Sequence, residues 1–305
     1  MFEMNKSVEH PQMVPQGPAT ATAGEVCRAL TKASRSNFTY AFLFLPAARR
    51  EALYAIYAFC RVTDDLVDEA GASPDANPPL LERLAAWRAE LAACIRGEAT
   101  HPVTQRLAET IRTYRIPPHY FEELLDGVEM DVVKSRYATF GELQQYCHRV
   151  AGVVGLMCIE VFGYSRPETR EYAERLGTAF QLTNILRDLG TDCARNRVYL
   201  PQEDLARFGC PEADLFERRL SPAYRALMRF EVERARGFYA AAEAALPAED
   251  RRSMLPAHIM NAIYRRILER IESGGYDVFS RRVRLSRPHR LALAFGWWLR
   301  HRFDA

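Results

Sequence analysis

Apolar residues recur every three to four positions through most of this chain, which is the spacing of one face of an α-helix. No stretch of useful length alternates apolar and polar residues as a half-buried strand would, and no internal repeat of solenoid length is present. The pattern therefore predicts an all-α protein, with helical patterning that begins near Gly24. Helices are predicted at about 47–69, 80–96, 102–114, 117–133, 140–163, 167–190, 202–207, 221–246, 249–273 and 286–302.

Segments without this periodicity set the domain organisation. Residues 1–22 are rich in Pro, Gln, Thr, Gly and Ala, and they are predicted to form a mobile N-terminal tail. Residues 71–79 form a turn-rich loop, and residues 191–201 are predicted to leave the helix. With 305 residues and an apolar fraction of 48%, the chain is expected to fold residues 23–305 into a single domain with a large core.

Charge and cysteine usage exclude several classes of protein. The 41 basic and 39 acidic residues give a net charge of +2, which argues against a nucleic-acid partner. Seven scattered cysteines without a C-x-x-C pair are typical of buried thiols in a reducing cytoplasm. The N-terminus lacks an apolar signal core, and the longest apolar run, Leu291 to Leu299, is shorter than the ~20 residues of a spanning helix. We therefore expect a cytoplasmic protein.

The stretch from Tyr57 to Glu69, YAFCRVTDDLVDE, carries the first candidate chemistry. Residues three and four apart on this predicted helix form one polar stripe, namely Tyr57, Arg61, Asp64 or Asp65, and Asp68. Asp64 and Asp68 are like charges at i,i+4, so a positive group is expected between them. A divalent cation such as Mg²⁺ is the simplest candidate, because carboxylate oxygens suit a hard ion. A solvated acidic face is the alternative.

A second acidic stretch, QLTNILRDLGTD, repeats the arrangement. Its polar residues are spaced three, four and four and share one helix face, namely Gln181, Asn184, Asp188 and Asp192. Arg187 lies beside them. Carboxylates, an amide and arginines on two helices suit Mg²⁺ held against a phosphate-bearing substrate, because arginine can bind phosphate oxygens directly.

Together with YCHRVAGVVGLM (Tyr146–Met157) and RVYLPQEDL (Arg197–Leu205), the two acidic stretches resemble the squalene/phytoene synthase family. The resemblance runs from about Ser34 to the 280s. It implies a single-domain isoprenoid synthase bundle of helices around a central active-site cavity, which joins two isoprenoid diphosphates head to head. Within the family, NFTYAFLFLP, DGVEMDVVKSRY, LGTAFQLTNILRDLGTD and AIYRRILERIE most resemble bacterial presqualene diphosphate synthases of hopanoid pathways, with phytoene synthases close behind. Asn196 stands where relatives commonly have glycine.

The resemblance also implies roles for the polar residues. The residues that map onto metal ligands, directly or through water, are Asp64, Asp68, Asn184, Asp188 and Asp192. Three arginines are assigned to the diphosphates because their planar donor forks suit phosphate oxygens, namely Arg61, Arg187 and Arg197. Ion pairing with the aspartates is the alternative for these arginines. Gln181 completes the expected polar set.

Aromatic and small residues are the candidates for the apolar part of the site. Phenols expected to bond phosphate or face a carbocation are Tyr57, Tyr146, Tyr199 and Tyr264, with Tyr57 and Tyr264 taken as catalytic. The tail needs an apolar tunnel that excludes water, and its candidate lining is Phe38, Phe42, Leu43, Val150, Val154, Leu156 and Leu182. Tyr54 and Phe42 are expected at the tunnel floor, where they would stop a farnesyl tail. Ordinary core packing is the alternative for each of these residues.

Two further sets were open to more than one interpretation. Ala151, Gly152 and Gly155 would let either a neighbouring helix or a prenyl chain approach closely. Glu129 and Asp131 would either support the metal ligands from behind or be surface charges, which is the commoner case.

The expected reaction is the condensation of two farnesyl diphosphates to presqualene diphosphate with Mg²⁺. Alternatives within the class are a complete squalene synthase, which would need NADPH, and a phytoene synthase that uses geranylgeranyl diphosphate. A non-catalytic scaffold relative is the alternative from a different class, and intact aspartate pairs argue against it. Farnesyl diphosphate and downstream squalene-forming enzymes are the expected partners.

The C-terminal stretch Ser286–Phe303 combines arginines with a dense apolar run that includes Trp297 and Trp298. Basic flanks and paired tryptophans fit a helix that lies at a bilayer surface, on the inner face of the membrane. A helix docked into the protein core would use the same residues. The greasy product favours the membrane alternative, because such a product leaves best into lipid.

Overall fold

The computed structural model describes residues 21–34, 36–68 and 77–303, and for Asp68 and residues 77–79 it describes the backbone alone. The predicted tail and most of the loop at 71–79 therefore lie outside the described residues. Within the described part, all regular elements are helical. They are α1 (Ala23–Ala33), α2 (Phe38–Phe42), α3 (Ala47–Asp68), α4 (Asn77–Arg96), α5 (Pro102–Tyr114), α6 (His119–Val133), α7 (Phe140–Cys147), the π-helical turn η2 (His148–Gly152), α8 (Val153–Phe162), α9 (Thr169–Cys193), α10 (Gln202–Arg207), α11 (Glu212–Phe216), α12 (Pro222–Ala245), the 3₁₀ turn η3 (Ala248–Asp250), α13 (Leu255–Ser273) and α14 (Arg287–Phe303).

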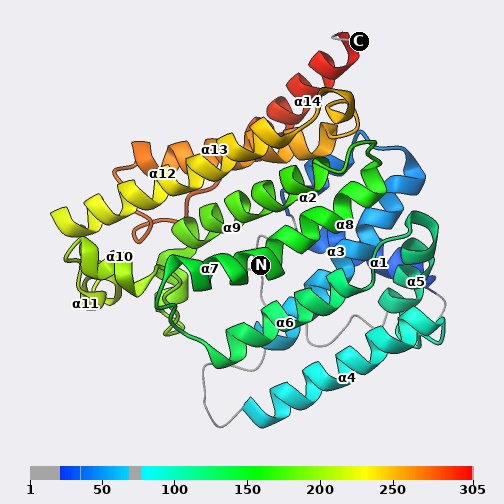
Figure 1. The fold of residues 1–305 in the computed structure, drawn as a ribbon, viewed down its shortest axis with the longest axis horizontal. Helices are drawn as coiled ribbons and strands as arrows, with labels where there is room; N and C mark the ends of the chain where they lie inside the picture. Colours follow the sequence, from blue (N-terminus) through cyan, green and yellow to red (C-terminus); the bar gives the residue numbers. More distant parts are fainter. Residues whose placement is uncertain (1–20, 35, 69–76, 304–305) are drawn as a thin grey trace.

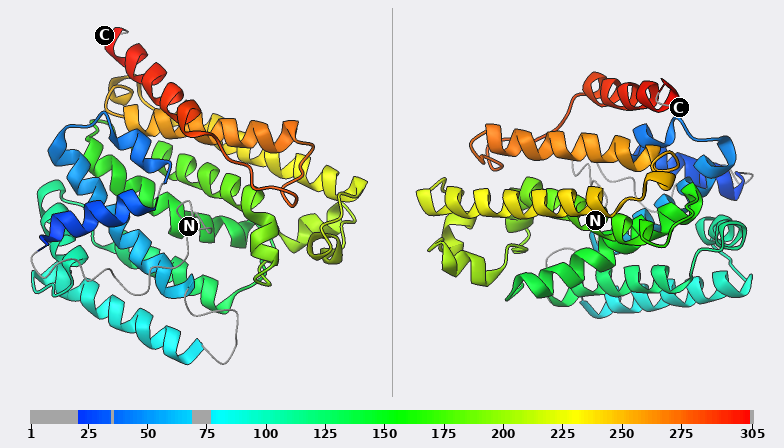
Figure 2. Two further views of the ribbon diagram at one scale, coloured as in Figure 1. Left: turned by 180° about the vertical axis from the view of Figure 1, so that it is seen from behind. Right: turned by 45° about the horizontal axis from the view of Figure 1, so that its top comes forward.

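Helix α9, the longest of the described helices, lies at the centre of the bundle (Figure 1). It packs against α12 and α13 on one side and against η2 and α8 on the other. Helices α3 and α6 lie beyond α8, and α4 forms an outer layer (Figure 1). Helix α14 crosses over α13 as the outermost element at the opposite side, as both views of Figure 2 show. This arrangement confirms the predicted all-α single-domain fold.

The predicted helix at 140–163 was wrong as a single element, because it divides into α7, η2 and α8. The π turn at His148–Gly152 is packed closely on two sides. A Cβ atom on Gly127 of α6 would lie 2.7 Å from the Arg149 Cβ atom, and one on Gly177 of α9 would lie 2.5 Å from the Ala151 carbonyl oxygen. A single widened turn changes the apolar spacing by about one residue, so the sequence pattern does not reveal it.

Two other boundaries that matter for the site, and several short elements, differ from the prediction. Helix α9 continues to Cys193, so Asp192 still belongs to the helix. Helix α13 begins at Leu255 instead of 249, because Pro256 fits only the first turn of a helix. The short helices α2 and α11 were not predicted, and the segment after α9 makes an isolated β-bridge between Val198 and Arg136.

Glycines set the distance of α9 from α8 and η2. A Cβ atom on Gly155 of α8 would lie 2.6 Å from the Ala173 carbonyl oxygen of α9, and Gly177 of α9 makes the equivalent close approach to Ala151 of η2. Both approaches are to backbone atoms, which cannot rotate away. The structure therefore shows the close approach of a neighbouring helix, and Ala151 and Gly155 also line an apolar cavity, which keeps the other expected use open.

Gly177→Ala should destabilise the fold by about 1–3 kcal/mol, because the added methyl group overpacks a contact with rigid backbone. Gly237→Ala is the matched control, since Gly237 lies within α12 and a Cβ atom there would meet nothing within 4 Å. That variant should gain about 0.5–1 kcal/mol through helix propensity alone. Urea unfolding measures both changes, and equal effects of the two substitutions would contradict the packing account.

Candidate active site

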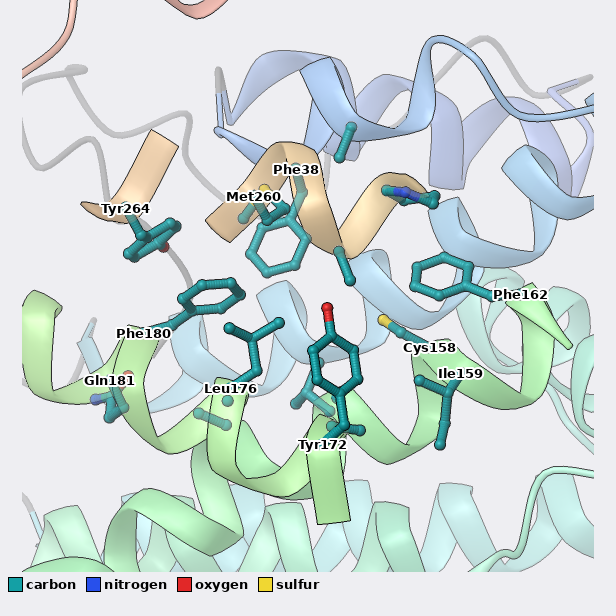
Figure 3. Close-up of a pocket in the computed structure, with 18 of the residues that line it drawn as sticks. Phe38, Cys158, Ile159, Phe162, Tyr172, Leu176, Phe180, Gln181, Met260 and Tyr264 are labelled. Atoms are coloured by element: carbon teal, nitrogen blue, oxygen red, sulfur yellow. The ribbon is translucent and has the colours of Figure 1, made fainter. Parts of the chain in front are cut away.

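An apolar cavity lies between α2, α8, α9 and α13. Of the seven residues predicted to line the tunnel, four line this cavity, namely Phe38, Phe42, Val150 and Val154. The other three do not line it, since Leu43 is exposed and Leu156 and Leu182 are buried elsewhere in the core. Figure 3 shows further aromatic and aliphatic side chains around the same space, among them Phe162, Leu176, Phe180 and Met260. Tyr54 is placed differently, since its ring packs against Phe42 at 6.2 Å between centroids and supports that wall from behind.

One end of this cavity is polar. Gln181 and Asn184 of α9 line it, and Tyr264 of α13 lies beside them with its ring stacked on Phe180 at 4.5 Å (Figure 3). Asp188 and Asp192 follow Asn184 at one-turn intervals along the same helix. The acidic part of α9 therefore begins where the apolar cavity ends.

Asp188 is held by two arginines. Arg187 donates from Nη2 to Oδ2 at 2.6 Å and from Nε to Oδ1 at 3.1 Å. Arg282 donates to the same two oxygens at 3.0 and 3.3 Å. Arg187 therefore makes the aspartate pair that the sequence left as the alternative to phosphate binding. Arg282 was missed, because it lies in an irregular basic segment after α13 with no motif around it.

Burial lowers the pKa of Arg282, and the nearby negative charge of Asp188 partly offsets this lowering. A guanidinium in this position remains charged, because arginine titrates far above neutral pH. The clamp therefore brings two positive charges to one carboxylate, which lies one helical turn beyond the cavity-lining Asn184.

The first acidic stretch lies on α3. The carboxylate of Asp64 is buried, at 4% exposure, and the Tyr57 ring lies 6.0 Å from that of Phe38, which lines the cavity. Arg61 pairs with Asp65 instead of Asp64, with Nε to Oδ2 at 2.9 Å and Nη2 to Oδ1 at 2.6 Å. Asp65 therefore has a partner on its own helix. Helix α3 ends at Asp68, whose side chain lies outside the described residues.

Asp131 of α6 is the largest correction to the sequence analysis. It is 3% exposed, so it is not a surface charge, and it accepts hydrogen bonds from the Tyr146 hydroxyl at 2.9 Å and the Tyr199 hydroxyl at 2.8 Å. Arg197 donates to its backbone carbonyl at 3.1 Å. Tyr146 and Tyr199, proposed for phosphate or carbocation contact, thus direct their hydroxyls at Asp131 and stack on each other at 5.3 Å. Glu129 is the surface charge, where it pairs with Arg88.

Burial raises the pKa of the Asp131 carboxyl, while Arg197 and the two phenol hydrogen bonds oppose that rise. The same burial and the charge of Asp131 raise the pKa values of Tyr146 and Tyr199 well above their ordinary range. Both phenols therefore remain protonated donors at neutral pH. Both phenol hydrogen bonds depend on the one carboxylate, whereas Arg197 binds the backbone carbonyl of the same residue.

Helix α6 connects the two acidic helices through this cluster. Its Val128 packs in a small apolar cluster with Val67 of α3, which lies three residues after Asp64 along the chain. Three residues after Val128, Asp131 binds the segment that follows α9. That segment folds back on its own helix, because the Arg197 N–H donates to the Asp192 carbonyl at 2.9 Å. The structure thereby positions Arg197 beside the end of α9.

The oxygen donors on these helices fit Mg²⁺ by their chemistry. Asp64, Asn184 and Asp192 are buried oxygen donors, and Mg²⁺ in proteins is commonly bound by one or two carboxylates together with substrate phosphates. Among the described side chains, no three His, Cys, Asp or Glu groups lie close enough to hold one ion. The expected partner of Asp64, Asp68, is not among those side chains. Substrate oxygens would complete such a site.

The fold and these features define a helical isoprenoid synthase, with the acidic part of α9 at the polar end of an apolar cavity and the Tyr57 ring of α3 packed on the cavity-lining Phe38. Residues 31–289 match the model of the squalene/phytoene synthase family, and the chain belongs to that family. Enzymes of this family are prenyltransferases that act on isoprenyl diphosphates with a divalent metal.

Individual relatives divide between two chemistries. The phytoene synthase of Arthrospira platensis is 39% identical over 87% of this chain and 89% of its own length. The 15-cis-phytoene synthase of Synechococcus elongatus is 38% identical over 89% and 92%. The crystal structure of squalene synthase HpnC from Alicyclobacillus acidocaldarius has a TM-score of 0.74 and 31% identity, over 84% of this chain and 95% of that one. A dehydrosqualene synthase in complex with a ligand has a TM-score of 0.79 at 28% identity, over 91% and 95%.

Asp131→Ala should cost about 2–4 kcal/mol of stability, because it leaves two buried phenol hydroxyls without their acceptor. Glu129→Ala on the same helix is the matched control and should change stability by less than about 0.5 kcal/mol, since it removes an exposed ion pair. Urea denaturation with fluorescence detection compares the two variants. A loss at Asp131 no larger than the loss at Glu129 would show that the cluster does not hold the site together.

Proposed function

We propose that this protein condenses two farnesyl diphosphates head to head to presqualene diphosphate. The observation that carries the proposal is the acidic, arginine-bearing part of α9, which begins where the apolar cavity ends. A diphosphate needs positive charge and oxygen-ligated metal, and a prenyl tail needs a dry apolar space. This end of α9 offers the first, and the cavity offers the second.

The protein's own groups would act on the substrate in three ways. Arg61, Arg187 and Arg197 would bind diphosphate oxygens, and Arg282 would join Arg187 in doing so. When metal and substrate bind, the Asp188 carboxylate would exchange its arginine partners for the metal, and the arginines would bind phosphate oxygens instead. The carboxylate would therefore have a positive charge beside it at every stage. Mg²⁺ held by Asp64, Asp68, Asn184, Asp188 and Asp192 would neutralise the leaving diphosphate as a Lewis acid.

The apolar walls would protect the allylic cation that forms when the diphosphate leaves. The cavity walls keep water away from the cation, which water would convert to an alcohol. The rings of Tyr57 and Tyr264 lie near the polar end, where an aromatic face stabilises a cation without attacking it. The double bond of the second farnesyl chain then attacks the cation, and loss of a proton closes the cyclopropane.

The length of the cavity favours a farnesyl tail. Its lining along α9 runs from Asn184 to Tyr172, which is about 18 Å at 1.5 Å per residue. Three extended isoprene units measure about 15 Å and four about 20 Å, at four bonds per unit and roughly 1.25 Å of advance per bond of ordinary length. Phe42, supported by Tyr54, would stop longer tails at the wall formed by α2.

Phytoene synthesis from geranylgeranyl diphosphate is the second candidate. The 37–39% identity to phytoene synthases over most of the chain favours it. The first half-reaction, which forms a cyclopropyl intermediate, would have the same requirements at the polar end. A complete squalene synthase would add a reduction by NADPH to the same starting reaction.

Incubation with Mg²⁺ and either farnesyl or geranylgeranyl diphosphate, with and without NADPH, separates these candidates. The expected product is presqualene diphosphate from the farnesyl donor, unchanged by NADPH. Asp64→Asn and Asp188→Asn should each reduce turnover at least about a hundredfold with the fold intact. Preferred conversion of the longer donor would support the phytoene reading, and failure to convert either donor would leave a scaffold function.

We also propose that α14 contacts the membrane surface as a peripheral helix. One face docks on the protein, where Trp298 stacks on Phe44 at 5.6 Å and Trp297 on His258 at 5.0 Å. The arginine expected at its basic flank, Arg290, is docked as well and donates to Asn37. Beside this docked face, where Phe295 stacks on Trp298 at 5.5 Å, large apolar side chains stay exposed between basic residues, namely Leu291, Phe295 and Phe303 with Arg287, Arg300 and Arg302.

Both uses predicted for this helix therefore find support, because docking leaves an apolar and basic face outside. Helix α14 contains no acidic residue, which suits an anionic lipid surface. Among the described helices, none is long and apolar enough to cross a bilayer.

Replacing Leu291, Phe295 and Phe303 together by serine should weaken binding to anionic vesicles more than about tenfold, because each side chain contributes apolar area to the contact. Leu81→Ser with Ile95→Ser on α4 is the matched control, since both residues are exposed hydrophobics on another face. Cosedimentation with vesicles measures the partitioning. Equal partitioning of the triple variant and the control would show that the exposed side chains of α14 do not contribute to vesicle binding.

A further inference from the structure

Tyr172 places a polar group in the apolar part of the cavity. Its side chain lines the cavity from the first turn of α9 and is 1% exposed. Figure 3 shows the hydroxyl oxygen directed into the cavity, between Phe38, Cys158 and Phe162. Among the described residues, this hydroxyl has no hydrogen-bond partner. A buried donor without a partner costs about 1–3 kcal/mol of folding free energy. An acceptor from a bound molecule would satisfy this hydroxyl.

The fold holds this hydroxyl in place. Asp250 fixes the start of α9, because its carboxylate accepts hydrogen bonds from the Ser165 N–H at 2.8 Å, the Ser165 hydroxyl at 2.7 Å and the Arg166 N–H at 3.0 Å. The His258 ring lies 6.4 Å from the ring of Tyr172 on the side of α13. Burial raises the pKa of the phenol above its ordinary range, so it remains a donor at neutral pH. The acceptor must therefore come from whatever fills the cavity.

The position of Tyr172 matches one part of a farnesyl tail. It lies about 18 Å along α9 from Asn184, and Asn184 is the residue at the polar end of the cavity. If the first carbon of the tail lies one helical turn below Asn184, about 13 Å remain to Tyr172. The last double bond of an extended farnesyl chain lies about 11–13 Å from that carbon, at roughly 1.25 Å of advance per bond. The electrons of this double bond are the acceptor that an isoprenoid can offer there.

We propose that Tyr172 selects isoprenoid tails over saturated tails of equal length, by donating its hydroxyl hydrogen to the terminal double bond of the bound chain. The proposal rests on the proposed function, since it assumes that the cavity holds a prenyl tail. Contacts of this kind contribute weakly, about 0.5–1 kcal/mol. That range converts to a preference of about two- to fivefold for the unsaturated tail.

The test compares two slowly ionising probes, farnesyl S-thiolodiphosphate and its 10,11-dihydro counterpart, by calorimetric titration in the presence of Mg²⁺. The wild-type protein should bind the unsaturated probe about two- to fivefold more tightly. Tyr172→Phe keeps the ring and removes only the hydroxyl, so the two probes should then bind equally. Tyr137→Phe is the matched control and should leave the wild-type ratio unchanged. Tyr137 is also fully buried, and its hydroxyl has no hydrogen-bond partner among the described residues, but it does not line the cavity.

The outcomes separate the two proposals. Failure of both probes to bind the wild-type protein would overturn the proposed function. Tight binding with the same ratio in wild type and Tyr172→Phe would overturn the role of Tyr172 and leave the function standing. Loss of the ratio in Tyr137→Phe as well would assign the preference to general loosening of the core, which also overturns the proposal.

Discussion

Carboxylates buried beside an apolar cavity are costly to desolvate, and the rest of this structure depends on how their charge is balanced. Asp188 is balanced by Arg187 and Arg282, and Asp65 by Arg61. Asp131 is held by two phenols, with Arg197 beside it. Arg282 reaches Asp188, and Tyr199 and Arg197 reach Asp131, from segments that are far apart in the sequence, whereas Arg61 and Asp65 pair within α3. The charges of the site therefore also hold α6, α9 and the segments after α9 and α13 in register.

The same arrangement prepares the site for a diphosphate. Arginines that pair with aspartates at the cavity rim are already desolvated in part and already oriented, so an incoming anion finds its donors in place. Close packing of α8 on α9 through Gly155 and Gly177 keeps the apolar walls rigid beneath that rim. Helix α9 thus contributes both the acidic residues at the polar end of the cavity and the close packing of its apolar part.

Most of the fold and part of the site could be predicted from the sequence. Helical periodicity placed α5 at its observed ends and α3 within a residue, and the one-face spacing identified Asn184 and Asp188. The π turn at His148–Gly152 escaped prediction because one widened turn hardly alters an apolar pattern. The remaining misses concern tertiary contacts. Asp131 resembles a surface charge until its two tyrosines are seen, and no local motif marks Arg282 as the partner of a residue on α9.

The central claim is that α3 and α9 hold one metal–diphosphate assembly between them. It is tested most directly by a crystal structure of the protein with Mn²⁺, as a stand-in for Mg²⁺, and farnesyl S-thiolodiphosphate, with the metal located by anomalous scattering. The account predicts Mn²⁺ bound to the diphosphate and to carboxylates of both helices, with Asp64 on one side and Asp188 or Asp192 on the other. Metal bound at one helix only, or a diphosphate held away from both helices, would contradict it.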